Sequence, residues 1–238
     1  MEAVDYVSKM VLYEDNHLLI LNKRAGDIVQ GDITGTEPLL EKARAYIKFR
    51  YNKPGNVFLG LPHRLDQPVS GAVIFARTSK ALARMNQMLH DREIRKIYWA
   101  VVKNLPPEES GQLTHYMSRN RQKNKSYAFE SPRKNASKAE LKYRLIASGD
   151  HYHLLEIELL TGRHHQIRSQ LSVLGCPIKG DLKYGAPRPN PDASIHLHAR
   201  SLGFSHPVSG DKLSIVAPVP DEPLWKYFEA INTSDPDR

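Results

Sequence analysis

The chain has 238 residues, of which 40% are hydrophobic and 25% are charged, and its formal net charge is +8. This size and composition are typical of one or two globular domains with a hydrophobic core. No run of about 18 apolar residues is present, which excludes a membrane-spanning helix, and the acidic N-terminus is unlike a secretory signal peptide. The lone cysteine, Cys176, excludes an internal disulfide. We therefore expect a cytoplasmic protein with Cys176 packed in its core.

Short apolar or β-branched runs between turn residues predict strands along the whole chain. In chain order these runs are 11–13, 17–23, 57–59, 72–76, 94–102, 138–146, 153–160, 195–199 and 213–219. The run 18–21 lacks alternation, so its strand should be buried on both faces. Segments 52–56 and 186–193 contain Pro and Asn and are predicted to be loops.

Apolar residues at helical spacing predict four helices. The first follows Thr36, and the others cover about 78–90, 167–174 and 222–231. Thr36 should cap the first helix, with Pro38 in its first turn, and Thr78 or Ser79 should cap the second. Met85 on the second helix is interpreted as a core residue rather than as a ligand.

Positive charge is concentrated between Met117 and Arg144. Nine basic and two acidic residues give this stretch a net charge of +7, close to that of the whole chain. Aromatic side chains are interleaved with the basic ones: Tyr116, Tyr127, Phe129 and Tyr143. We expect hairpin strands joined by polar turns. A solvated loop would explain a charge run alone, but the clustering and the aromatic residues favour a nucleic-acid surface.

The nine residues 63–71, His-Arg-Leu-Asp-Gln-Pro-Val-Ser-Gly, stand directly before the apolar run 72–76. A charged turn that contains Pro and Gly and leads into a buried strand can hold a carboxylate rigidly. Asp66 is therefore our candidate for a reactive acid. On these residues alone, the alternative is that Asp66 is only a turn former that hydrogen-bonds to its own backbone.

Three segments resemble the motifs of the RluA type of RNA pseudouridine synthases. The first motif is matched by His63, Arg64, Leu65, Asp66, Ser70 and Gly71. The second, Lys-x-Tyr-x-Ala-x-Val, begins at Lys96 and places its tyrosine at Tyr98. The third, Thr-Gly-Arg-x-His-Gln-Ile-Arg, corresponds to residues 161–168. Segments 22–26 and 180–185 also resemble the family.

The chain departs from the family pattern at several positions: Arg24, Asp27, Gln30, Gln67, Val69 and Gln170. The first three leave open whether the loop after residue 22 contacts RNA, as it does in relatives. Gln67 and Val69 lie in the first motif, and Gln170, where the family usually has His, lies two residues after the third. None of them replaces the acid.

The resemblance covers about 11–219 and implies a single catalytic domain over 1–238, without the small N-terminal RNA-binding domain of many relatives. It implies an α+β fold, with a mixed, mainly antiparallel sheet, flanking helices and a basic RNA-binding cleft. Pattern alone supports only a mixture of α and β. The implied function is isomerisation of a specific uridine to pseudouridine in ribosomal or transfer RNA. This reaction is redox-neutral and needs no cofactor.

The resemblance also assigns roles to single residues. Asp66 is the catalytic carboxylate, which acts on C1′ or on a ribose proton. Arg168 is the cation that pairs with it, and Tyr98 closes the base pocket. Arg64 fills the space that the flipped uridine leaves. Further RNA contacts are assigned to His63, Arg163, His165 and Gln166.

Two other functions stay open at this point. A non-catalytic RNA-binding or RNA-chaperone protein could keep the same fold. A zinc hydrolase could use the His pairs at 151/153 and 196/198, but no third ligand is identifiable. The sequence has no Walker-type loop and no Cys-x-x-Cys pair, so we expect neither a nucleotide cofactor nor a metal. We expect a monomer whose partner is RNA.

Overall fold

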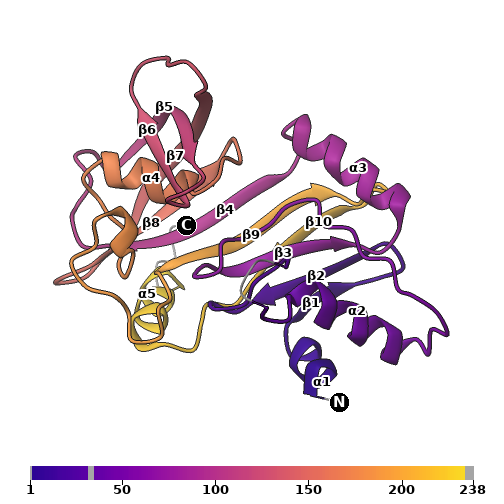
Figure 1. The fold of residues 1–238 in the computed structure, drawn as a ribbon. Coiled ribbons are helices and arrows are strands. Elements are labelled where there is room, and N and C mark those ends of the chain that lie inside the picture. Colours follow the sequence, from indigo (N-terminus) through magenta and orange to yellow (C-terminus); the bar gives the residue numbers. More distant parts are fainter. Residues whose placement is uncertain (1, 32–34, 234–238) are drawn as a thin grey trace. The chain divides into compact units, whose positions relative to one another are not determined.

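The computed structural model describes residues 2–31 and 35–233. These residues form two compact units, whose elements are drawn in Figure 1. Unit 1 comprises the chain up to Ile94 together with Ala199–Pro218. Unit 2 comprises Arg95–His198 together with the residues from Val219 onward. The single catalytic domain expected over 1–238 stays a prediction.

Five helices and ten strands are distributed along the described residues, and β4 to β8 follow one another without an intervening helix. The helices are α1 (Glu2–Ser8), α2 (Leu39–Arg50), α3 (Ser79–His90), α4 (Gln166–Val173) and α5 (Pro223–Thr233). The strands are β1 (Val11–Glu14), β2 (Leu18–Lys23), β3 (Ser70–Ala76), β4 (Arg95–Val102), β5 (Ser110–Asn120), β6 (Lys125–Phe129), β7 (Ser137–Ser148), β8 (His153–Leu159), β9 (Leu197–Ser205) and β10 (Lys212–Val216). Neighbouring strands pair antiparallel within each unit, which confirms the predicted α+β class with a mainly antiparallel sheet.

In unit 1 the strand order is β1-β2-β3-β9, and β10 pairs with β9. β2 and β3 are buried along almost their whole length, which confirms the strand predicted to have two buried faces. Met85 of α3 packs in the core against one face of these strands, and Figure 1 shows α2 on their other side. The predicted cap of α3 is also confirmed, because Thr78 Oγ1 accepts a hydrogen bond from the Ala81 N–H at 3.1 Å.

The start of α2 differs from the prediction. The helix begins at Leu39, with Pro38 at the N-cap position and no capping side chain, so Thr36 is not the cap. The Leu39 N–H donates instead to the carbonyl oxygen of Ile28 at 2.7 Å. The backbone carbonyl of Ile28 thus accepts the hydrogen bond of a helix N-terminal N–H, a role that a capping side chain usually has.

The segment 57–59 is not a strand, which corrects a second prediction. Backbone pairing occurs only at the following residue, where Gly60 forms an isolated bridge with Ala76. Leu59 is buried, whereas Phe58 is 48% exposed. In this apolar run Leu59 packs into the core, whereas the Phe58 ring is exposed to solvent.

Helix α1 was not expected, and it is held by residues that depart from the family pattern. The Tyr6 hydroxyl donates to the Asp27 carboxylate, with distances of 2.9 and 2.8 Å to its two oxygens. The Arg24 guanidinium lies 4.8 Å from the Tyr6 ring centroid. Burial and the adjacent Asp27 raise the pKa of Tyr6 to about 12, so the phenol keeps its proton at neutral pH.

In unit 2 the strand order is β4-β8-β7-β5-β6. Strands β5 and β6 form an antiparallel hairpin, as predicted for the basic stretch, and β7 pairs antiparallel with the other edge of β5. Helix α4 packs on β5 and β6, and α5 inserts Trp225 and Phe228 beside Trp99 of β4. Cys176 is buried as expected, and burial raises the pKa of its thiol.

Strand β9 is longer than predicted. The alternating pattern ends at 199, but the strand continues to Ser205 because β10 pairs with its second half. Pairing with a partner later in the chain thus extends the strand beyond its local signal. Among the described residues, no helix is both long and apolar enough to cross a membrane.

Candidate active site

Asp66 lies in a tight turn of unit 1 just before β3. The Val69 N–H donates to the Asp66 carbonyl oxygen at 3.1 Å, which closes a four-residue turn around Pro68. A neighbouring loop is tied to this turn twice: the Gly26 N–H donates to the Gln67 carbonyl oxygen at 2.8 Å, and Gln67 Nε2 donates back to the Gly26 carbonyl oxygen at 3.3 Å. Gln67, a departure from the family pattern, thus helps to fix the backbone from which the half-buried Asp66 side chain projects.

A buried lysine holds the same turn. Lys23 ends β2, and its side chain is fully buried. Its ammonium donates to three backbone carbonyl oxygens, those of Arg24 at 2.8 Å, Gln67 at 3.1 Å and Val69 at 2.7 Å. Because two of these acceptors follow Asp66 directly in the turn, Lys23 fixes the local backbone of the candidate acid.

The Lys23 ammonium is also a positive charge near Asp66. Burial lowers the pKa of Lys23 from 10.5 to about 8, and the charges of Asp27 and Asp66 oppose this change. At neutral pH the ammonium therefore stays charged and attracts the Asp66 carboxylate. Sequence reasoning did not single out Lys23. The signal available was a lysine inside a strand pattern with two buried faces.

Replacing Lys23 by Met is expected to lower the free energy of unfolding by about 2–4 kcal/mol, because the carbonyl oxygens of Arg24, Gln67 and Val69 lose the ammonium as a donor. The loss should be independent of pH below about 8. Between pH 8 and 10.5 the unfolded state of the wild type binds more protons than the folded state, so wild-type stability should rise with pH. Urea unfolding of both proteins from about pH 7 to about pH 10 measures the difference. A difference that stays constant or shrinks over this window would contradict a buried ammonium.

Two other residues of the first motif shape the backbone around Asp66. Gly71 has φ +114°, and a Cβ on it would lie 2.4 Å from the Ala199 carbonyl oxygen, so only glycine fits. His63 Nε2 accepts a hydrogen bond from the Ile74 N–H at 3.0 Å. His63 therefore joins its loop to β3, and the RNA contact expected of it stays a prediction.

Arg64 is exposed, and the adjacent Leu65 is buried. Leu65 thus anchors the segment in the core between Arg64 and Asp66. Val69, another departure from the family pattern, is buried and supplies one of the carbonyl oxygens that Lys23 binds. An apolar side chain suits this position in the core.

Tyr98 and Arg168 belong to unit 2. Tyr98 lies in β4 opposite Ile157 of β8 and is buried. Arg168 lies in the first turn of α4, and its Nε and Nη2 donate to the two carboxylate oxygens of Asp181 at 2.6 and 2.9 Å. The two side chains are only 6% and 1% exposed. A two-pronged ion pair of this kind fixes the plane of the guanidinium.

The segment 180–185 supplies both residues that hold Arg168. Besides Asp181, Tyr184 lies with its ring centroid 5.1 Å from the guanidinium carbon. The Tyr184 hydroxyl accepts a hydrogen bond from the Ser126 N–H at 2.8 Å, which ties it to β6. Sequence reasoning recognised this segment but gave it no role. Its structure shows that it fixes the position of Arg168.

His165 precedes α4 with a left-handed backbone, φ 53°. Its Nδ1 lies 2.9 Å from the Tyr184 hydroxyl, and its ring stacks on His164 with centroids 3.8 Å apart. Burial, and then the charge of Arg168, lowers the pKa of His165 to about 2, so the ring is neutral at pH 7. Lys183 and other nearby cations act in the same direction. This part of unit 2 therefore has a positive potential that suits a phosphate backbone.

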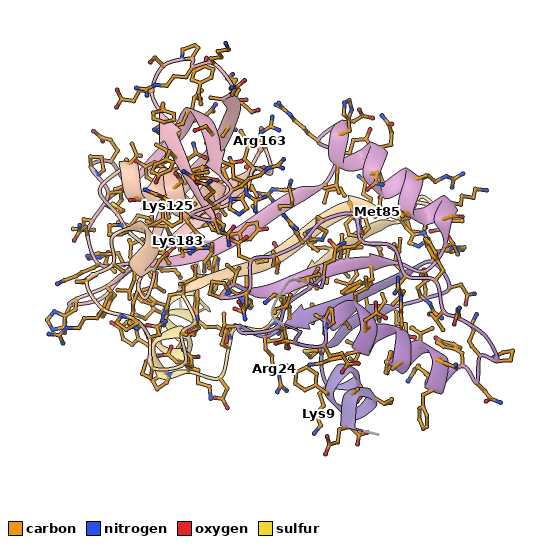
Figure 2. All side chains as sticks on the ribbon, viewed as in Figure 1. Lys9, Arg24, Met85, Lys125, Arg163 and Lys183 are labelled. Atoms are coloured by element: carbon orange, nitrogen blue, oxygen red, sulfur yellow. The ribbon has the colours of Figure 1, made fainter. Side chains whose placement is uncertain are left out.

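Three cations labelled in Figure 2 belong to this part of unit 2: Lys125, Arg163 and Lys183. Lys183 Nζ donates to the Asn124 carbonyl oxygen at 3.1 Å, and Arg163 Nε donates to the Lys138 carbonyl oxygen at 3.1 Å. Both side chains are exposed. The RNA contact predicted for Arg163 remains a prediction, and its exposure is compatible with it.

Gln166 and Gln170 are buried and organise the start of α4. Gln166 Oε1 accepts hydrogen bonds from Thr161 Oγ1 at 2.8 Å and from the Arg163 N–H at 2.9 Å. Gln170, where relatives have His, donates through Nε2 to the Leu113 carbonyl oxygen at 3.2 Å. Gln166 thus shapes the loop of the third motif. Its expected RNA contact, like that of His165, stays a prediction.

The predicted site residues divide between the two units. His63, Arg64 and Asp66 share one loop of unit 1, whereas Tyr98 and the third motif belong to unit 2. The pairing of Asp66 with Arg168 therefore stays a prediction. Among residues 2–31 and 35–233, no group of three or more His, Cys, Asp or Glu side chains is arranged to hold a metal ion.

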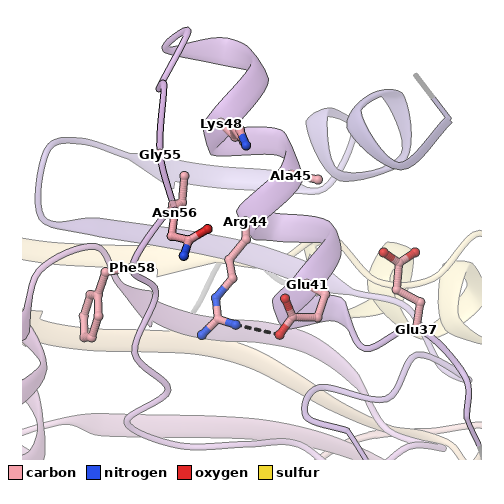
Figure 3. Close-up of a pocket in the computed structure, with 9 residues that line it drawn as sticks. Glu37, Glu41, Arg44, Ala45, Lys48, Gly55, Asn56 and Phe58 are labelled. Carbon is pink, nitrogen blue, oxygen red and sulfur yellow. Dashed lines mark hydrogen bonds and ion pairs between the residues drawn. The ribbon is translucent and has the colours of Figure 1, made fainter.

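A groove with a volume of about 690 Å³ lies in unit 1 between α2 and the segment 55–58. Figure 3 shows Arg44 of α2 in this groove, paired with Glu41 at 2.6 Å. None of the predicted site residues lines it. It is therefore separate from the turn that carries Asp66.

Comparison with known proteins gives one consistent result. Residues 17–173 match the family model described as RNA pseudouridylate synthase. The ribosomal large subunit pseudouridine synthase C of Buchnera aphidicola is 33% identical over 230 residues, which is 93% of this chain and 70% of that protein. An uncharacterized RNA pseudouridine synthase of Synechocystis is 32% identical, and the match covers 88% of this chain and 65% of that protein. An uncharacterized RNA pseudouridine synthase of Bacillus subtilis is 31% identical, and the match covers 93% of this chain and 74% of that protein.

The fold has close counterparts among solved structures. Human RNA pseudouridylate synthase domain containing 4 superposes with a TM-score of 0.78 at 24% identity, covering 97% of this chain and 95% of the human one. Human RNA pseudouridylate synthase domain containing 1 superposes with a TM-score of 0.68 at 23% identity, covering 96% of each chain. These likenesses establish the fold. The chain spans about two thirds of the length of the curated relatives it matches.

Proposed function

We propose, from the premise that this chain belongs to the RNA pseudouridylate synthase family, that it isomerises a specific uridine to pseudouridine in RNA. The resemblance to the RluA type is thereby confirmed at the level of the family. The comparisons favour an enzyme over the non-catalytic RNA-binding protein. The named bacterial relatives act, by their names, on the ribosomal large subunit. Ribosomal RNA is therefore our first candidate substrate, and transfer RNA is the second.

The reaction breaks the bond between uracil N1 and ribose C1′, turns the base and joins C5 to C1′. The proton on C5 leaves, and N1 gains one, so atoms and electrons balance without an oxidant. In our proposal the Asp66 carboxylate acts either on C1′ or on a ribose proton. Arg168 supplies a fixed positive charge, and Tyr98 closes the pocket over the base. Each acts as a group held in place before substrate arrives.

The observation that best supports this function is the rigid turn that carries Asp66. Lys23 binds three carbonyl oxygens in and next to the turn, and Gln67 exchanges two hydrogen bonds with Gly26. A fully buried lysine that binds this backbone gives the Asp66 carboxylate a fixed position, which a reactive acid needs. Burying the Lys23 ammonium costs free energy of folding, and in our proposal this cost is offset by the need to hold the Asp66 carboxylate in one position.

RNA binding is assigned to the hairpin strands β5, β6 and β7 and to the cations near His165. The cations near His165, which add to the effect of burial in lowering its pKa, are the kind of charge that attracts phosphate. Binding should weaken steeply with salt for the same reason. We further propose that the enzyme acts as a monomer in the cytoplasm, where ribosomal RNA is available.

The direct test incubates the purified protein with ribosomal and transfer RNA transcripts and locates pseudouridine by chemical probing. The proposed function predicts one or a few modified uridines. If RNA is bound but stays unmodified at every position, the chain is an RNA-binding protein on the same fold.

Arg64→Ala is expected to slow modification of folded RNA by about 10-fold to 100-fold, because the flipped uridine costs a few kcal/mol to extrude and Arg64 would fill the vacated space. Modification of a short unstructured RNA should change much less, since that base is already unstacked. Initial rates on the two RNAs measure the contrast. Equal slowing on both would show that Arg64 acts otherwise.

A further inference from the structure

A second basic segment leads into the Asp66 turn, and the proposed function does not use it. From Lys42 to Pro62, before the first motif, the sequence has five basic residues and no acidic one. Residues 48–56, which comprise the end of α2 and the loop after it, are all exposed. Three aromatic side chains of this region are exposed to unusual degrees: Phe49 at 67%, Tyr51 at 42% and Phe58 at 48%. The Arg77 guanidinium lies 4.4 Å from the Tyr51 ring centroid, which gives that ring a structural role. Large exposed rings within ten residues of one another nevertheless indicate a binding surface.

Structural roles explain only part of this cluster. Cations such as Arg50 in the last turn of α2 interact favourably with the helix dipole. Arg50 and Arg77 also share the carboxylate of Glu14, at 3.5 and 3.3 Å. Neither effect accounts for Phe49 or Phe58, because an exposed ring contributes nothing to the core.

The groove beside α2 gives this surface a shape. Its two ends differ in charge: Glu37 and Glu41 lie toward the start of the helix, and Lys48 lies toward its end (Figure 3). Glu41 is already paired with Arg44. The segment 55–58 forms the opposite wall, and the groove's volume of about 690 Å³ is in the range that holds small molecules or a nucleotide.

The surface is connected to Asp66 by a short path within unit 1. Gly60 bridges to Ala76 at the far end of β3, and the Asp66 turn precedes the first residue of that strand. The strand has seven residues, so its ends lie about 20 Å apart at roughly 3.3 Å per residue. Stacked nucleotides rise by about 3.4 Å each, so this length corresponds to about six nucleotides.

We propose that the α2 patch, defined as Lys48, Phe49, Tyr51, Lys53 and Phe58, binds single-stranded RNA that flanks the target uridine. The proposal rests on the proposed function, which it extends to substrate length. Alternating cations and exposed rings are the combination that single-strand binders use, since cations follow the phosphates and rings stack on bases. An acidic protein could pair with the two lysines of the patch, but its carboxylates would not explain the exposed aromatic rings.

Two double variants and one control separate the contributions. Phe49→Ala with Phe58→Ala, the ring variant, removes two of the three rings, and Lys48→Gln with Lys53→Gln, the charge variant, removes the two charges of the patch. Lys212→Gln with Val216→Ala changes an exposed lysine and an exposed apolar residue on β10 of the same unit. All six side chains are exposed, so the proteins should fold alike. The probe is a fluorescein-labelled, unstructured oligouridine of about 20 nucleotides.

The ring variant should bind the oligouridine at least about 10-fold more weakly than the wild type. The charge variant should lower the slope of log affinity against log salt by about 0.7 for each lost phosphate contact. The control should bind as the wild type does. Wild-type affinity in the ring variant, or equal loss in the control, would overturn the proposal. Loss of binding to a labelled polyglutamate peptide alone would show an acidic protein partner instead.

Turnover distinguishes this proposal from the proposed function. On a modifiable RNA, the ring variant should raise KM and leave kcat unchanged, and trimming the RNA to about three nucleotides beside the target should erase the difference. If the wild type modifies RNA and the ring variant has the same KM, the α2 patch is wrong and the function stands. If binding of the oligouridine depends on the patch but no RNA is modified, the proposed function is wrong and RNA binding by the α2 patch stands.

Discussion

Asp66→Asn is expected to abolish pseudouridine formation, with a rate at least about 10³-fold below that of the wild type. The amide has the size of the carboxylate but neither its charge nor its capacity to attack C1′ or take a proton. RNA affinity should stay within about twofold, because the basic surfaces are unchanged. Single-turnover kinetics on the modifiable RNA, together with fluorescence anisotropy, measure both quantities.

The structure makes this substitution a clean test. The backbone on either side of Asp66 is fixed by the buried Leu65 and by the hydrogen bonds of Lys23, so the variant should remain folded. Asp91→Asn is a matched control, because Asp91 is an exposed aspartate at the end of α3 in the same unit. It should keep the wild-type rate. An Asp66→Asn protein with near-normal turnover would remove Asp66 from the reaction.

Asp181→Leu is expected to lower the free energy of unfolding by about 3–5 kcal/mol, because it leaves the buried Arg168 guanidinium without its carboxylate. Asp221→Asn provides the comparison. Asp221 pairs with Lys226 at the surface, where it is 90% exposed, so its loss should hardly change stability. Urea unfolding of both variants measures the contrast. Equal small losses would contradict a strong buried pair.

The double variant Arg168→Met with Asp181→Leu separates stability from activity. Replacing both charges by apolar side chains should recover most of the stability, since the desolvation cost disappears with the pair. Activity should not recover, because Arg168 is the proposed cation of the site. A double variant that is as unstable as Asp181→Leu would show that the loss comes from packing. One that regains turnover would exclude Arg168 from the reaction.

Where structure follows from local chemistry, the sequence predicts it well. Continuous apolar runs predict β2 and β3, and Thr78 followed by helical spacing predicts α3 with its cap. The hairpin of β5 and β6 is expected for the basic stretch, and the run 138–146 predicts most of β7. In each case the decisive interactions join residues that are close in the chain or repeat a simple period.

The wrong or missing predictions of secondary structure occur where a group far away in the sequence determines where an element begins, ends or forms. The cap of α2 is a backbone carbonyl of residue 28, and no side-chain pattern before the helix can reveal it. Helix α1 depends on Tyr6 meeting Asp27. Strand β9 runs past its own pattern because β10 pairs with it. Tertiary contacts override local preference in all three.

The candidate site shows the same division. Resemblance finds Asp66, Tyr98 and Arg168, whose roles belong to sequence motifs. It includes Lys23 and Asp181 in the segments 22–26 and 180–185 but gives no role to either, because a charged side chain is ordinarily expected at the surface. Only the structure shows that these two charges are buried and fully engaged. For Lys23 the available signal is a charged residue within an apolar strand pattern, whereas Asp181 lies outside any strand or helix and gives no such signal.

The central claim is that this protein makes pseudouridine with Asp66 as its acid. It is tested most directly by pseudouridine mapping of ribosomal and transfer RNA from cells with and without the gene, repeated after return of the wild-type or the Asp66→Asn gene. Our account predicts that at least one site disappears without the gene and that only the wild type restores it. Sites that all persist without the gene, or that the Asp66→Asn form restores, would contradict the account.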